Sequence, residues 1–139
     1  MTRFTKPLAT FAAAAAIAAF ATPASAQQAS YCDGNLKANS FYSNVLQSPR
    51  GGADVEYHGQ FQNQDPQRRA MTATMLRIVT IRFGNLTFNV LRPVARFDLN
   101  SYEQKDITLL AVHTTGQGGQ GAPTPAHVGQ QIRFTCSYR

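Results

Sequence analysis

The clearest pattern along this chain is the alternation of apolar and polar residues, which is typical of half-buried β-strands. Residues 54–62 place Val, Tyr, Gly and Phe on one face and Glu, His and Gln on the other. Residues 131–138 alternate Ile, Phe, Cys and Tyr with Gln, Arg, Thr and Ser. Both segments are therefore predicted to be strands with one face in the core.

Four further segments are predicted to be strands, at residues 70–83, 86–91, 94–99 and 107–114, because they are rich in apolar and β-branched residues between turn-forming residues. Arg77 interrupts the apolar face of the first of these, which predicts a bulge or two separate strands. Pro93 predicts that the strand before it ends at an edge or a bend.

Two segments depart from alternation. In residues 36–46, Phe41 with Val45 and Tyr42 with Leu46 lie four apart, which predicts a short helix on the core, with a seventh strand as the alternative. Residues 116–129 are dense in Gly and Pro and almost free of large apolar side chains, which predicts a flexible loop. The Pro-Thr-Pro sequence within this loop argues against a helix there.

Six or seven strands with one weak helical segment predict an all-β fold, an antiparallel β-sandwich or a small barrel with one short helix near the start of the mature chain. The order of elements, with a Pro-containing segment at 91–94 before an extended run and a Cys in the last strand, resembles bacterial immunoglobulin-like sandwiches. The resemblance implies two packed sheets. The chain departs from that pattern because it has no Trp and carries its two cysteines near its ends.

Residues 1–26 have the organisation of a cleavable secretory signal peptide. Arg3 and Lys6 provide a positive start, an Ala-rich apolar run follows, and small residues occupy the expected cleavage positions. A membrane anchor is the alternative, but the apolar run is short and weakly apolar for that role. We therefore expect residues 27–139 to form a single domain, periplasmic or secreted, without a transmembrane segment.

Export determines the expected state of Cys32 and Cys136, the two cysteines of the chain. An oxidising compartment lets a disulfide form and persist, so we expect these residues to be joined. Two free thiols or an intermolecular bridge are the alternatives. No Cys or His pair has zinc-ligand spacing, and neither a metal nor a cofactor is expected.

The formal net charge of +6 includes two basic residues of the signal segment, and the other basic residues are mostly scattered. A nucleic-acid partner is therefore not expected. Arg68 and Arg69 form the one compact basic spot, at the expected tip of the first hairpin. They are candidate contacts for an acidic glycan, a lipid headgroup or an acidic protein surface.

The remaining candidate binding residues surround the Gly-rich segment: His113, Gln117, Gln120 and His127. His113 and His127 are candidates for a two-histidine metal or acid–base site, although no third ligand is identified. His58 falls on the outward face of its strand and is interpreted as a solvated surface residue. Neither a nucleophile elbow nor a phosphate-binding loop has the required context, so no catalytic residue is assigned.

Together these features predict an exported β-sandwich that acts as a binding or structural module of the cell envelope rather than as an enzyme, with an envelope protein or a glycan as ligand. One alternative is a small secreted enzyme inhibitor that presents the Gly-rich loop or the hairpin tip. Another is an enzymatic or metal-binding protein that uses His113 and His127. An unpaired edge strand offers a further route, to self-association or to a strand from a partner.

Overall fold

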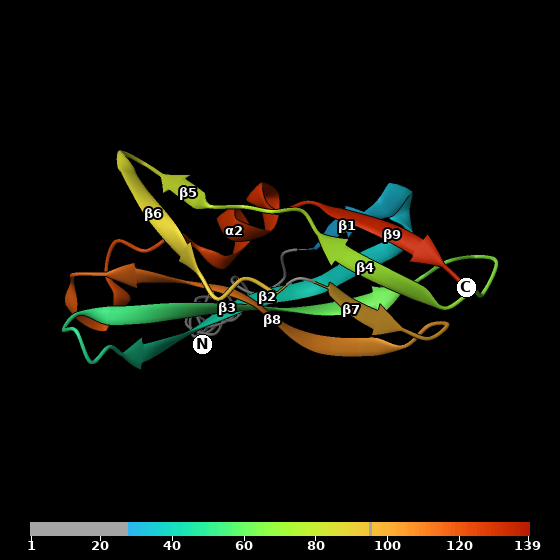
Figure 1. Cartoon of the computed structure of the whole chain (residues 1–139), viewed down its shortest axis with the longest axis horizontal. Coiled ribbons are helices and arrows are strands. Elements are labelled where there is room, and N and C mark those ends of the chain that lie inside the picture. The colour runs from blue at the N-terminus through green and yellow to red at the C-terminus, as the bar shows by residue number, and fades with distance from the viewer. Residues whose placement is uncertain (1–27, 95) are drawn as a thin grey trace, which may run out of the picture.

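A computed structural model describes residues 28–94 and 96–139, so the expected signal peptide lies outside the described residues. The chain forms two antiparallel sheets and one short α-helix (Figure 1), which confirms the all-β prediction. The larger sheet has the order β1-β2-β3-β8-β6-β5, and the smaller has the order β7-β4-β9. The bounds are β1 (Ala29–Tyr31), β2 (Leu36–Gln47), β3 (Ala53–Asn63), β4 (Met71–Met75), β5 (Thr80–Phe83), β6 (Leu86–Leu91), β7 (Arg96–Leu99), β8 (Gln104–Thr114), α2 (Pro125–Gln131) and β9 (Phe134–Tyr138).

The core lies between the two sheets. The small sheet covers one half of the large sheet, while α2 lies over the other half, where it contacts β2, β3 and β5 (Figure 1). Phe61 of β3 is fully buried, and its ring centroid lies 5.2 Å from that of Phe97 on β7 and 5.3 Å from that of Phe134 on β9. These aromatic contacts join the sheets, and the alternation of residues 54–62 places the ring there.

Two of the connections that cross between the sheets lie where the sequence predicts an interruption. Residues 70–83 divide into β4 in the small sheet and β5 in the large sheet, with Arg77 in the connection between them. This confirms the interpretation as two strands. Pro93 lies between β6 and β7, where the chain returns to the small sheet, which confirms the expected bend.

The helix predicted over residues 36–46 is wrong, and the alternative strand is correct, since this segment belongs to β2. The register of β2 against β3 shifts between Ala38 and Ser40. Such a bulge changes the phase of the alternation, so that Ala38 and Phe41, three residues apart, are both buried. Val45, in contrast, is 51% exposed. The four-residue spacing that suggested a helix is equally compatible with a strand, because residues an even number of positions apart share one face of a strand.

The prediction of an irregular loop over residues 116–129 is also wrong in its second half, because α2 begins at Pro125. Thr124 is the N-cap, and its Oγ1 accepts a hydrogen bond from the backbone N–H of His127 at 3.2 Å. Proline suits the first turn of a helix because the missing N–H has no partner there in any case. The Pro-Thr-Pro sequence thus starts a helix instead of preventing one.

Two buried tyrosines hold this segment on the large sheet. The hydroxyl of Tyr57 donates to the carbonyl of Pro123 at 2.6 Å, and the hydroxyl of Tyr31 donates to the carbonyl of Gly129 at 2.6 Å. Burial raises the pKa of Tyr31 to about 12, and it also raises the pKa of Tyr57. Gly129 lets α2 approach the sheet, since a Cβ there would lie 2.6 Å from the ring of Phe41.

The predicted disulfide between Cys32 and Cys136 is present, with a Cα–Cα distance of 6.0 Å. It connects the segment between β1 and β2 to β9, and so links the two sheets covalently. Within the described residues, no helix has the length and apolar character needed to span a membrane.

Candidate functional site

The main candidate site is a cleft between two diverging strands of the large sheet. β6 pairs with β8 only at Val90–Val112 and Leu91–Ala111. From this closed end the β5–β6 hairpin rises away from β8 (Figure 1). The cleft between the strands, which we call the fork cleft, has a volume of about 380 Å³ and is lined by Arg50, residues 86–89, Leu91, residues 113–116 and Gln120. Its volume lies within the range of small ligand sites.

The turn between β2 and β3 forms one end of the fork cleft because it packs closely on the end of β8. A Cβ at Gly52 would lie 2.1 Å from the carbonyl oxygen of Thr114, and the φ angle of Gly52 is +69°. Glycine alone combines this approach with this backbone conformation. The turn also carries Arg50, which no described residue engages in an ion pair. Its guanidinium therefore remains available at the wall of the cleft.

His113 stands on the β8 wall and is held by a carboxylate. Its Nδ1 lies 2.8 Å from Oδ1 of Asp54, the residue opposite it on β3. Asp54 is only 9% exposed, so the contact is largely shielded from water. With the proton on Nδ1 donated to Asp54, Nε2 is left as an acceptor. This arrangement provides an oriented hydrogen-bonding group at the cleft.

The other residues predicted around the Gly-rich segment do not share one site. Gln120 lines the fork cleft with His113, whereas Gln117 lines a separate hollow beside the β2–β3 turn. His127 fastens α2 to β5, since its Nε2 lies 2.6 Å from the carbonyl oxygen of Arg82. The two imidazoles of the proposed two-histidine site thus have separate partners. No group of three or more His, Cys, Asp or Glu in the described part of the chain could hold a metal ion.

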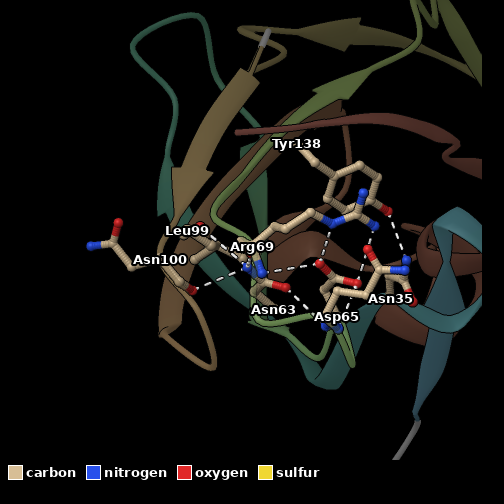
Figure 2. A network of polar contacts seen from close by, with 8 residues as sticks. Asn35, Asn63, Asp65, Arg69, Leu99, Asn100 and Tyr138 are labelled. Carbon is tan, nitrogen blue, oxygen red and sulfur yellow. Dashed lines mark hydrogen bonds and ion pairs between the residues drawn. The ribbon is translucent and has the colours of Figure 1, made fainter.

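The two adjacent arginines have different surroundings. Arg68 is exposed, and its guanidinium lies 6.0 Å from the ring centroid of Tyr102. Arg69 donates from Nε to Oδ2 of Asp65 at 2.8 Å, and its guanidinium lies 4.1 Å from the ring centroid of Tyr138 (Figure 2). Arg69 therefore connects the β3–β4 loop to β9, and the pair does not form a simple basic tip.

The network around Arg69 predicts a dependence of stability on acid. Hydrogen bonding to Arg69 lowers the pKa of Asp65. A carboxyl group with a lowered pKa in the folded state stabilises the fold above its unfolded-state pKa, and this contribution is lost as the pH falls through the folded-state value. We expect Asp65→Asn to be less stable than the wild type at pH 7, with the difference shrinking as the pH falls below the ordinary pKa of an aspartate, 3.8. Urea midpoints measured at several pH values test this.

The control for this experiment is Asp33→Asn, which changes an exposed carboxylate in the turn after β1. Its urea midpoint is expected to follow that of the wild type across the same pH range. Equal acid sensitivity of the Asp65→Asn variant and the wild type would show that the Arg69 contact contributes nothing to the acid response.

The outer face of β2, β3 and β8 carries a second polar cluster, around His58. The rings of Tyr42 and His58 stack with centroids 4.8 Å apart, and Nε2 of His58 lies 3.0 Å from Oε1 of Glu56. The hydroxyl of Tyr42 donates to Asp106. His58 faces outward as expected, but only 8% of it is exposed because Tyr42 covers it. Its polar groups are satisfied within the cluster.

Sequence reasoning missed Arg50 and the strand residues Thr87 and Asn89, which line the fork cleft. Arg50 lies in a Pro- and Gly-containing turn, which gave a signal for a chain reversal but none for a site. Comparisons of the chain with family models, with curated proteins and with solved structures found no match.

Proposed function

We propose that this protein is an exported binding module of the cell envelope that takes its ligand into the fork cleft. The observation that carries the proposal is the cleft itself, in which Arg50, Asn89 and His113 provide polar groups beside the apolar side chains of Leu86 and Leu91. A mixture of apolar walls and a few oriented polar groups is typical of binding sites. The disulfide is consistent with an oxidising compartment.

Contacts of the Gly-rich segment favour a binding module over an inhibitor. An inhibitory loop has to project from the protein in order to enter an enzyme cleft. Here a Cβ at Gly119 would lie 3.0 Å from a methyl group of Val55, and the carbonyl of Pro123 accepts a hydrogen bond from buried Tyr57. The segment is thus packed on the sheet, where Gln120 forms part of the cleft wall.

The proposal is tested by filling the cleft. Asn89 is an exposed cleft-lining residue, so Asn89→Trp adds bulk at the site without displacing a buried side chain. The disulfide-intact wild type is used to capture proteins from an envelope extract and to screen a glycan panel. We expect a specific ligand, and a loss of affinity of about tenfold or more in Asn89→Trp.

The matched control is Ser137→Trp, at an exposed position of β9 in the small sheet. It introduces the same aromatic group away from the fork cleft, and it is expected to bind like the wild type. Equal binding by both variants would exclude the fork cleft as the site. Absence of any ligand for the wild type in both screens would contradict the proposed module.

A further inference from the structure

The backbone of β6 carries free hydrogen-bonding groups on its fork side. The N–H of Val90 donates to the carbonyl of Val79 at 2.9 Å, so Val90 directs its backbone towards the β5 side. In an antiparallel ladder, successive residues direct these groups to opposite sides. Thr87 and Asn89 lie an odd number of residues before Val90, so their N–H and C=O groups point to the opposite side, into the fork cleft. There β8 no longer pairs with β6.

The backbone of β8 has the same property on the opposite wall. Leu91 shares the orientation of Thr87 and Asn89, and it pairs with Ala111. Ala111 therefore directs its backbone groups towards β6, and so does His113, two residues later. His113 lies beyond the last β6–β8 pair and lines the cleft. Both walls thus present the backbone edge of a strand to the same gap.

We infer that the fork cleft accepts an extended polypeptide segment, which pairs as an added strand with Thr87 and Asn89 of β6 and faces His113 of β8. The inference rests on the proposed function and names its ligand class. Main-chain hydrogen bonds provide affinity in strand addition, and side-chain contacts provide specificity. Residues 86–89 provide room for about three or four residues of a segment that rises about 3.4 Å per residue.

The side chains of the cleft indicate the composition of the segment. Successive side chains of a strand point to opposite faces, so one set would meet Leu86 on the inner side and the other set would meet Asn89. Arg50 adds a positive charge to the cleft, and it forms no ion pair with any described residue. A guanidinium favours carboxylates, in bidentate geometry where it is available. The preferred segment therefore alternates apolar residues with acidic or polar ones.

A peptide is favoured over a glycan because the lining offers backbone edges and no exposed aromatic platform. Phe88 is the one aromatic residue among those that line the cleft, and it is only 8% exposed. Sugar rings commonly bind by stacking on open aromatic faces, which Phe88 does not present. The glycan alternative is retained as an outcome of the test.

The experiment selects binders from a random peptide library with the disulfide-intact protein. We expect the selected peptides to alternate apolar and acidic residues, and Arg50→Glu to weaken their binding about tenfold or more. Arg96→Glu is the control, because it reverses an exposed charge on β7. On peptide binding, hydrogen exchange is expected to slow at the backbone N–H groups of Thr87, Asn89 and His113.

Methylation of the peptide backbone provides a test that changes nothing in the protein. Methylating the peptide nitrogens that face β6 is expected to abolish binding. Methylating the alternate nitrogens, which point away from β6, is expected to preserve it. Selected peptides that bind equally well in both methylated forms, or that leave exchange at Thr87 and Asn89 unchanged, would overturn strand addition.

The outcomes also separate this inference from the proposed function. Binding of a glycan or a small molecule that is blocked by Asn89→Trp, together with a library that yields no peptide, would leave the binding module intact and overturn the inference. Peptides that bind equally to the wild type and to Asn89→Trp would overturn both, because the ligand would then lie outside the fork cleft.

Discussion

Replacement of both Cys32 and Cys136 by Ala is expected to lower the free energy of unfolding by about 2–5 kcal/mol. The bond joins residues separated by 104 positions, so that it closes nearly the whole described chain into one loop. In the chain-entropy account, so long a loop removes much of the freedom of the unfolded state and gives values near the upper end of that range. Urea denaturation of the oxidised wild type and of the double variant measures the difference.

The position of the bond gives this prediction a local component. β9 is an edge strand of the small sheet and pairs with β4 alone. Loss of the bond is therefore expected to accelerate hydrogen exchange in β9 more than in β3, which is paired on both sides. Ser137→Ala, at an exposed position beside Cys136, is the control and should change stability by less than about 0.5 kcal/mol.

A free energy of unfolding of the double variant within about 1 kcal/mol of the wild-type value would contradict the expected contribution of the bond. If the variant does not fold, the wild type provides the same comparison when it is denatured with and without reductant. Equal urea midpoints in those two conditions, with the bond shown to be reduced, would lead to the same conclusion.

Strands with an uninterrupted alternation could be predicted from the sequence because their pattern is local. β3 and β9 both place their alternate apolar residues in the core, as at Phe61 and Phe134. The β2 segment was misassigned because residues four apart, such as Phe41 and Val45, share one face of a strand as well as one face of a helix. The bulge between Ala38 and Ser40 also obscures the alternation of this strand, because its position is defined by the pairing with β3.

The Gly-rich segment was misassigned for a different reason. Proline was interpreted as a helix breaker, although Pro125 stands in the first turn, where it is favourable. Thr124, directly before Pro125, is a favourable N-cap residue and is therefore a local signal for the start of this helix. Gly118 and Gly119 adopt φ angles of +66° and +77° in the preceding turn. This turn lies between Gln117, which lines the hollow beside the β2–β3 turn, and Gln120, which lines the fork cleft.

The fork cleft was beyond sequence reasoning because it arises from non-local geometry. His113 could be proposed from its place at the end of a strand beside the Gly-rich segment. Arg50 and Asn89 could not, since each lies more than 20 positions from His113 and reaches the cleft only through the order β3-β8-β6 and the divergence of β6 from β8. The contact of Arg69 with Tyr138 was hidden in the same way, because Tyr138 lies far from Arg69 along the chain.

Asn63→Ala is expected to lower the free energy of unfolding by about 2–4 kcal/mol, a large effect for one polar side chain. Asn63 is fully buried at the end of β3. Its Nδ2 donates to the carbonyls of Arg69 at 2.8 Å, Asn100 at 3.2 Å and Leu99 at 3.3 Å, while its Oδ1 accepts from the N–H of Asp65 at 3.0 Å (Figure 2). Truncation leaves buried backbone groups without partners. Urea denaturation at pH 7 measures the loss.

The adjacent Gln62 provides the control, since its amide makes a surface hydrogen bond to the carbonyl of Tyr102. Gln62→Ala is expected to cost less than about 0.5 kcal/mol. Asn63→Asp separates hydrogen bonding from size, because a carboxylate of nearly the same shape cannot donate to the three carbonyls. Facing those oxygens, it should have a raised pKa in the folded state, so that the variant loses stability as the pH rises above the unfolded-state pKa of about 3.9. At neutral pH, equal stability of Asn63→Asp and the wild type would show that the donor bonds contribute little.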